Sequence, residues 1–191
     1  MTATTAENPL AEGLERLPVS PTTLVIFGAT GDLARRKLLP AIYNLAHEGA
    51  LPGRFNLIGS SRGELSDEEF RRVATESIER FSRRSPDPAV LDRLLCDVRY
   101  VAGSFDDPSL YRRLGEVCAA FDDEAGLRLN RCFYLSTAPS FFPVIVEALG
   151  EHGLDRLDDA DVRVVVEKPI GTNLAEAREL NRRMLAVLDE Q

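Results

Sequence analysis

The fold of this chain is decided by residues 22–34, which read TTLVIFGATGDLA. The first six residues are apolar or β-branched, as in a strand buried on both faces of a parallel sheet. An amphipathic pattern typical of a helix then covers residues 32–47. Between strand and helix stand Gly28, Gly31 and Ala34, with the Gly-x-x-Gly-x-x-Ala spacing of a dinucleotide-binding turn.

Each position of this turn has a physical reason. Gly28 permits the tight turn off the strand, Gly31 lets the backbone approach a pyrophosphate, and Ala34 lets the helix pack close to the strand. The helix N-terminus adds free N–H groups and a partial positive charge. Thr30 offers a hydroxyl, and three basic residues follow at 35–37. The alternative is an ordinary strand-to-helix turn that contains two glycines.

The rest of the chain alternates between short apolar runs and amphipathic segments. Strands are predicted at 22–27, 55–59, 99–103, 131–136 and 162–167, and helices at 32–47, 67–81, 89–95, 109–121, 140–152 and 174–190. Ser66 and Glu69 form a capping box before the second helix, and Asn173 caps the last. This alternation predicts an α/β chain of the Rossmann type, with a doubly wound, mainly parallel sheet. We expect a flexible leader over residues 1–20 and a single domain over 21–191.

Composition narrows the function classes. The net charge of −8 argues against a nucleic-acid or membrane-surface partner, and no apolar run reaches the length of a membrane span. The cysteines are three in number and widely spaced, which fits neither a disulfide framework nor a metal site. We expect buried thiols, no bound metal and a cytoplasmic location.

The end of the second strand indicates which dinucleotide binds. It reads Gly59-Ser60-Ser61-Arg62, without the acid that usually holds a ribose 2′-hydroxyl. Arg62 matches a 2′-phosphate in charge and geometry, whereas an aspartate would repel it. Glu64, the nearest acid, comes too late. The sequence therefore favours NADP, with a solvated loop charge as the alternative for Arg62.

Two further strand ends carry polar residues. Lys168 lies in Glu167-Lys168-Pro169 after the fifth strand, where ligands of open α/β sheets bind, and Pro169 restricts its backbone. From there Lys168 can reach a substrate and the nicotinamide. The predicted fourth strand ends at Ser136, which can line the nicotinamide. The alternative for Lys168 is a surface lysine at a strand end.

These residues together resemble the N-terminal signature of the glucose-6-phosphate dehydrogenase family. The resemblance runs from about Thr23 to Glu190 in five ordered motifs. The first is Gly28-Ala29-Thr30-Gly31-Asp32-Leu33-Ala34-Arg35-Arg36-Lys37-Leu38-Leu39-Pro40-Ala41. The others are Ile58-Gly59-Ser60-Ser61-Arg62, Tyr100-Val101-Ala102-Gly103, Phe133-Tyr134-Leu135-Ser136 and Glu167-Lys168-Pro169-Ile170-Gly171.

The resemblance implies an NADP-dependent oxidoreductase of the pentose phosphate pathway. It would oxidise the C1 hydroxyl of glucose 6-phosphate to the lactone and pass the hydride to NADP. The family's cofactor residues carry over to Gly28, Ala29, Thr30, Gly31, Asp32, Leu33, Ala34, Arg35, Lys37, Arg62 and Lys168, to which we add Ser136. Lys168 also takes the family's role of positioning the sugar.

The sequence also departs from the family. The family continues into an Arg-Ile-Asp-His-Tyr-Leu-Gly-Lys segment, whose first histidine binds the substrate phosphate, and a later histidine is the general base. This sequence stops at Gln191 before either. We therefore expect the second, substrate domain to be missing and the chain alone to be inactive; a homo-oligomer stays open. Two alternatives are a stand-alone, non-catalytic NADP-binding module and the glucose–fructose oxidoreductase group. That group shares Glu167-Lys168-Pro169 but has a Gly-x-Gly-x-x-Gly turn.

Overall fold

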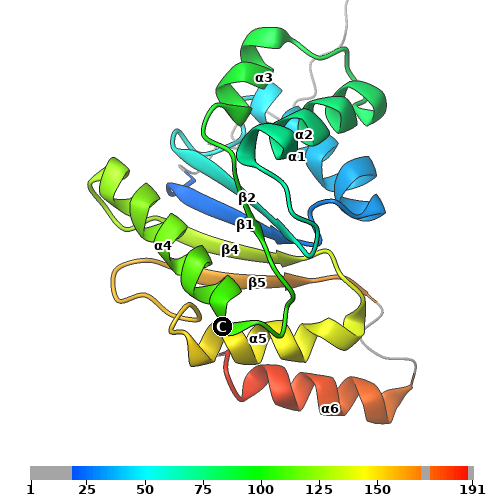
Figure 1. Cartoon of the computed structure of the whole chain (residues 1–191), viewed down its shortest axis with the longest axis vertical. Helices are drawn as coiled ribbons and strands as arrows, with labels where there is room; N and C mark the ends of the chain where they lie inside the picture. The colour runs from blue at the N-terminus through cyan, green and yellow to red at the C-terminus, as the bar shows by residue number, and fades with distance from the viewer. Residues whose placement is uncertain (1–18, 169–172, 189–191) are drawn as a thin grey trace, which may run out of the picture.

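The computed structural model describes residues 19–168 and 173–188 and is built on one parallel sheet (Figure 1). Every pair of neighbouring strands is parallel, in the order β3-β2-β1-β4-β5. The strands are β1 (Thr22–Phe27), β2 (Phe55–Ser61), β3 (Arg99–Ala102), β4 (Asn130–Leu135) and β5 (Val162–Val166). The strand order reverses between β1 and β4, which is where such sheets bind dinucleotides. The predicted α/β fold is confirmed.

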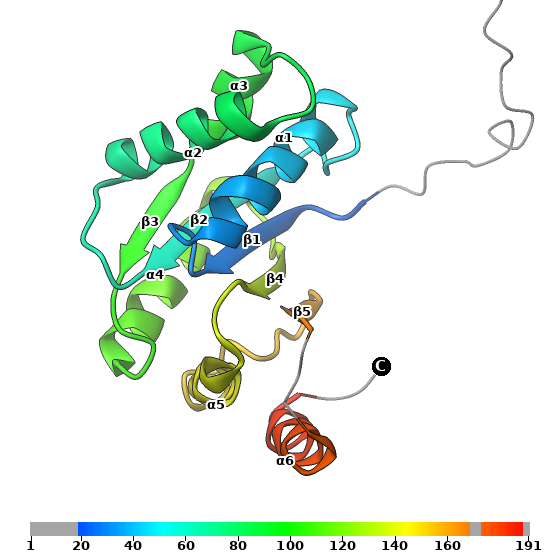
Figure 2. The same cartoon turned by 90° about the vertical axis from the view of Figure 1, so that its right-hand side faces the viewer.

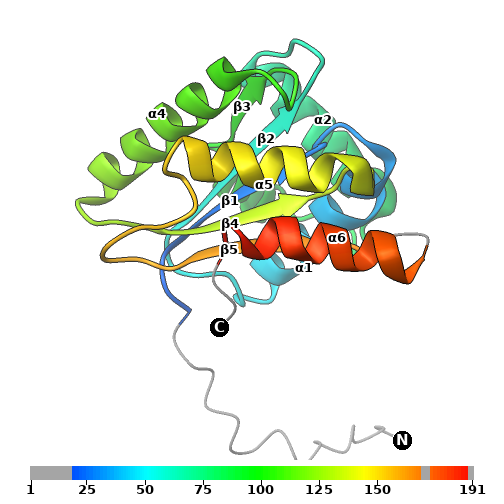
Figure 3. The same cartoon turned by 90° about the horizontal axis from the view of Figure 1, so that it is seen from below.

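Helices cover both faces of this sheet, as Figures 1 and 2 show. One layer holds α1 (Leu39–His47), α2 (Asp67–Phe81) and α3 (Pro88–Leu95). The other holds α4 (Pro108–Ala125), α5 (Phe142–Glu151) and α6 (Leu174–Leu185). In Figure 3, α6 runs beside α5. The doubly wound arrangement is therefore also confirmed.

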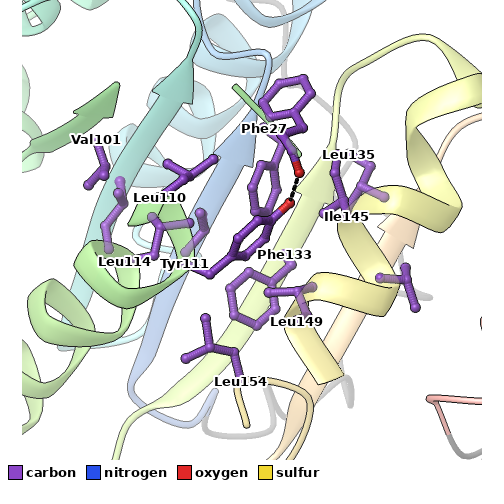
Figure 4. Packing of buried hydrophobic residues seen from close by; sticks show 14 of the residues in the cluster. Phe27, Val101, Leu110, Tyr111, Leu114, Phe133, Leu135, Ile145, Leu149 and Leu154 are labelled. Atoms are coloured by element: carbon purple, nitrogen blue, oxygen red, sulfur yellow. Dashed lines mark hydrogen bonds between the residues drawn. The ribbon is translucent and has the colours of Figure 1, made fainter. Parts of the chain in front are cut away.

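The sheet buries side chains on both faces, in the two-residue period of a strand. Val25 and Phe27 point toward α4 and α5, and Ile26 points toward α1 and α2; all three are fully buried. Figure 4 shows Phe27 among the aromatic side chains of the first face, where its ring lies 5.7 Å from that of Phe105. The Tyr111 hydroxyl donates to the Phe105 carbonyl at 2.6 Å. This packing holds the end of β1 rigidly in place.

The helix predicted over 32–47 is present, but it contains a π-helical segment, η1 (Ala34–Leu38). The N–H of Leu39 donates to the carbonyl of Ala34, five residues back. Pro40 has no N–H, and its ring crowds the carbonyl four residues earlier in a regular helix. A wider turn relieves that crowding, and such turns often lie at functional sites.

Other predicted elements differ only at their ends. The capping box is confirmed: Glu69 N–H donates to Ser66 Oγ at 3.2 Å, and Ser66 N–H donates to the Glu69 carboxylate at 2.8 Å. The helix predicted at 140–152 begins as a 3-10 turn, η2 (Pro139–Phe141), because proline suits a first turn that needs no donor. The leader predicted for 1–20 and Pro169 fall largely or wholly outside the described residues.

The prediction of buried thiols is wrong for one cysteine. Cys118 is buried and Cys132 is half-buried, but Cys96 is exposed just after α3. The helix ends at Leu95, which is buried, and the next residue, Cys96, faces solvent. Across residues 19–168 and 173–188, none of the helices has the length and apolar character that a membrane span requires.

Candidate functional site

Parallel pairing brings the carboxyl ends of four strands to one edge of the sheet. Phe27 lies opposite Ser60 of β2 and Leu135 of β4, and Leu135 lies opposite Val166 of β5. The residues that follow these positions therefore meet at the same edge. They include most of the residues predicted to bind a cofactor: Gly28 and the turn after it, Arg62, Ser136 and Lys168.

The turn after β1 requires glycine at its first position. Gly28 has a φ of +80°, and a Cβ there would lie 2.3 Å from the Ser136 carbonyl oxygen. The N–H groups of Gly28 and Ala29 both donate to the Ser60 carbonyl, at 2.7 and 3.1 Å. β1 is thus tied to β2 and lies against the end of β4 at this point, so the turn has one well-defined shape.

The next residues use two backbone donors within the turn and leave two without a backbone acceptor among the described residues. Gly31 N–H donates to the Gly28 carbonyl at 2.9 Å, and Thr30 N–H donates to Ser61 Oγ at 3.2 Å. Asp32 and Leu33 open the helix, and their N–H groups take no backbone acceptor from the part of the chain that is described. Free N–H groups at a helix start favour an anion.

Side chains of the turn divide by burial. Ala29 and Ala34 are fully buried. Ala34 is the first residue of η1 and belongs to the same buried cluster as Ile26 of β1, as predicted for a close helix–strand contact. Asp32, Leu33 and Arg35 are exposed. Leu33 can offer a cofactor its backbone N–H at the helix start.

Two buried hydroxyls flank the turn without a hydrogen-bond partner. These are Ser60 Oγ and Ser136 Oγ, for which the described residues supply neither donor nor acceptor. A buried hydroxyl left unpaired is costly. Ser136 follows β4 beside Gly28, so a polar ligand at this edge can satisfy it. The glycine cradle and these hydroxyls fit a dinucleotide.

Arg62 lies one residue beyond the contact between Ser61 and Thr30. Its side chain is exposed and forms no ion pair with the residues that the structure describes. Glu64 is exposed further along the same loop. The loop that follows β2 therefore presents an unpaired guanidinium close to the turn, and it contains no carboxylate before Glu64.

Lys168 lies at the far side of the edge, after β5. Its side chain is exposed, and the preceding residue, Glu167, accepts a hydrogen bond from the Tyr134 hydroxyl of β4. Burial and this hydrogen bond raise the pKa of Tyr134 to about 12. The structure places Lys168 and Ser136 at the same edge as the turn, but it fixes no contact between Lys168 and the turn.

A hollow of about 440 Å³ adjoins the turn and is strongly basic. It is lined by Thr30, Asp32, Arg35, Arg36, Arg80 and Phe81. A larger hollow of about 910 Å³ lies beside β5 and the loop before it, but its lining is net acidic, with two arginines, Arg156 and Arg163, against four aspartates, Asp155, Asp158, Asp159 and Asp161. That charge repels phosphates, so the basic hollow is the one that suits a dinucleotide. Lys37 lies outside its lining.

Sequence reasoning missed Arg80 and Phe81, because they belong to the end of α2 and reach the turn only through the packing of α2 on η1. The two histidines lie elsewhere. His47 ends α1, and His152 follows α5 and stacks on Tyr111 at 5.4 Å. Both helices run back from the carboxyl edge, so neither histidine lies beside the turn.

Comparison with known proteins agrees with this geometry. A family model described as the NAD binding domain of glucose-6-phosphate dehydrogenase matches residues 25–191. The glucose-6-phosphate 1-dehydrogenase 2 of Mycobacterium bovis is 42% identical over 188 residues, which cover 96% of this chain and 37% of that protein. The glucose-6-phosphate 1-dehydrogenase of Mycolicibacterium smegmatis is 40% identical, with 91% and 34% covered.

Solved structures give the same relationship. A glucose-6-phosphate dehydrogenase in complex with its substrate glucose 6-phosphate superposes with a TM-score of 0.80 at 32% identity, covering 89% of this chain and 35% of the other. The Mycobacterium avium glucose-6-phosphate 1-dehydrogenase gives a TM-score of 0.74 at 36% identity, covering 90% and 35%. The chain thus spans about a third of the length of these relatives.

Proposed function

This chain belongs to the glucose-6-phosphate dehydrogenase family, and we propose that it binds NADP along the carboxyl edge of its sheet as the cofactor domain of such an enzyme. The observation that carries the proposal is the Gly28 turn. Its glycine cannot be replaced without striking the Ser136 carbonyl, and the helix that follows presents free N–H groups. A pyrophosphate at these N–H groups would be held by the backbone of Asp32 and Leu33.

NADP is favoured over NAD by the end of β2. Arg62 supplies a guanidinium that suits a phosphate, and no acid precedes Glu64 to hold a ribose 2′-hydroxyl. Ser136 and Lys168, after β4 and β5, are assigned to the nicotinamide end of the dinucleotide.

For the reaction, we propose the oxidation of glucose 6-phosphate that the relatives' names describe. When bound, NADP would supply the acceptor for the hydride from C1 of the sugar. Lys168 positions the sugar hydroxyl, and the proton of that hydroxyl needs a base within hydrogen-bond reach. Neither histidine of this chain lies beside the turn. We therefore expect no sustained formation of reduced cofactor when the 191-residue chain alone is mixed with glucose 6-phosphate and NADP.

The test exchanges Arg62 for an acid. Arg62→Asp puts a negative charge where a 2′-phosphate is expected, so the Kd for NADP should rise by at least about tenfold while that for NAD changes little. Arg112→Asp makes the same charge change on an exposed position of α4, across the sheet, and should leave both constants within about twofold. Equal losses for NADP and NAD in Arg62→Asp would contradict the role given to Arg62.

A stand-alone NADP-binding module is the second candidate, favoured by the distance of both histidines from the edge. The coding sequence after codon 191 separates the two. A His-Tyr-Leu-Gly-Lys segment, in frame or shifted, supports the dehydrogenase, and unrelated sequence supports the module. The family match argues against the glucose–fructose oxidoreductase group. A cytoplasmic location is part of the proposal, and cell fractionation tests it.

A further inference from the structure

Two arginines from different helices share one aromatic ring beside the phosphate turn. The guanidinium of Arg36, in η1, lies 5.4 Å from the centroid of the Phe81 ring, and that of Arg80, in α2, lies 5.2 Å from it. Stacking fixes the plane of a guanidinium while its N–H edge stays free to donate. The ring therefore orients two fork-shaped donors at the wall of one hollow of about 440 Å³.

This hollow gathers positive charge that the protein does not balance. Three of its six lining residues are arginines, and Asp32 is the one acid among them. Asp32 pairs with Arg36 at 3.6 Å, but both side chains are more than half exposed, so the pair is weak. Arg35 and Arg80 form no ion pair with any described residue. In a chain of net charge −8, such a cluster favours a bound anion.

The position of the hollow relates it to one end of a dinucleotide. Thr30 lines it, and the N–H of Thr30 donates to Ser61 Oγ at the end of β2. The hollow thus adjoins the pyrophosphate turn, and the Thr30–Ser61 hydrogen bond links one of its walls to β2, the strand whose end faces the adenosine ribose in a Rossmann fold. The nicotinamide end would lie on the opposite side, toward Ser136 and Lys168.

We infer that this hollow receives the 2′-phosphate of NADP, and that Arg36 and Arg80 are phosphate contacts in addition to Arg62. The inference rests on the proposed binding of NADP. If Arg80 contacts the phosphate, the preference for NADP over NAD depends on α2 as well as on Arg62 after β2. The packing of α2 on η1 brings Arg80 to the turn. A 2′-hydroxyl, which carries no charge, gains little from this pair, so NAD does not use it.

The test measures the Kd for NADP, for NAD and for adenosine 2′,5′-bisphosphate with the full chain. Arg36→Gln and Arg80→Gln each replace the guanidinium with a shorter, uncharged polar side chain. Each should raise the Kd for NADP and for the bisphosphate by about five- to twentyfold and leave that for NAD within about twofold. Arg112→Gln, on α4, is the matched control and should leave all three unchanged.

Phe81→Leu gives an independent arm, because it keeps both charges and removes the ring that orients them. It should weaken NADP binding by about three- to tenfold, again without an equal loss of NAD. Thermal unfolding of each variant shows whether it folds, and any variant that binds NAD with unchanged affinity is folded at this site.

The outcomes separate this inference from the function on which it rests. If the unaltered chain prefers NADP and Arg62→Asp removes that preference, while Arg36→Gln and Arg80→Gln behave like Arg112→Gln, the two arginines only cover Phe81 and the inference is overturned alone. Equal losses of NADP and NAD in the two variants also overturn it. If the unaltered chain binds NADP no better than NAD, the proposed cofactor choice fails as well.

Discussion

The Tyr134 hydroxyl donates its hydrogen bond to the Glu167 carboxylate, joining the end of β4 to the residue that precedes Lys168. The two side chains lie next to each other because Tyr134 pairs with Val165 and Leu135 with Val166 in the parallel register. Glu167 is thus fixed by a neighbouring strand, and the backbone of Lys168 leaves β5 from a defined point.

This contact predicts a change in stability at alkaline pH. Burial and the Glu167 hydrogen bond raise the pKa of Tyr134 to about 12, above the ordinary value of 10.0. The native state keeps the proton that the unfolded state loses, so this contribution is complete below about pH 10 and is lost between about pH 10 and 12. The free energy of unfolding in urea should therefore fall less in Tyr134→Phe than in the unaltered chain between about pH 9 and pH 11.5. Equal falls would show that the contact does not form in solution.

Gly28 should be far less tolerant of a side chain than another glycine with a similar backbone. Gly28→Ala meets the Ser136 carbonyl oxygen at 2.3 Å and adds strain at a φ of +80°. We expect a loss of about 3 kcal/mol or more in the free energy of unfolding, and weaker binding of NADP and NAD alike. Gly49→Ala has a φ of +63° but open space around the new methyl, and it should cost only about 1 kcal/mol. Similar costs in urea unfolding at the two positions would contradict the close approach of the turn to β4.

Asp122, in α4, is joined to the start of β4 by a buried ion pair. Its carboxylate lies 3.0 Å from Arg131, which is 5% exposed, and also accepts the Leu129 N–H at 3.0 Å. Asp122→Ala leaves the Arg131 charge buried without this partner, which costs about 3–5 kcal/mol. Its exposed neighbour provides the control, since Asp123→Ala should stay within about 0.5 kcal/mol. Chemical denaturation measures both, and a loss below about 1 kcal/mol for Asp122→Ala would show that water reaches this pair.

The three thiols should differ sharply in reactivity. Burial raises the pKa of the Cys118 thiol to about 11, so it offers almost no thiolate and no access near neutral pH. Cys96 is exposed and Cys132 half-buried. A thiol reagent under native conditions should therefore modify Cys96 first and Cys118 last, and peptide mass analysis at successive times gives the order. Early labelling of Cys118 would mean that α4 opens from the sheet.

Most of the fold could be predicted because its signals are local. The apolar run of β1 and the glycines after it predict both the strand and the turn, and the register then carries the other strand ends to the same edge. The predicted end of β2 at Gly59 fell short by two residues. Ser60 and Ser61 have little strand propensity, but they pair with Val101 and Ala102 of β3, and that pairing extends the strand.

The parts that could not be predicted depend on tertiary packing. Arg80 and Phe81 lie far from the turn in sequence, and no spacing rule relates them to Arg36. Likewise the exposure of Cys96 depends on where α3 ends against α2, and a cysteine by itself suggests burial. The hydroxyl of Ser61 that accepts the Thr30 N–H belongs to the same class, because only the strand pairing brings the two together.

Calorimetric titration of the unaltered chain with NADP and with NAD, at one fixed ionic strength, tests the central claim most directly. We expect each dinucleotide to bind at one site and NADP to bind at least about tenfold more tightly, because three arginines against one aspartate line the basic hollow and Arg62 follows β2. Equal affinities, or tighter binding of NAD, would contradict it.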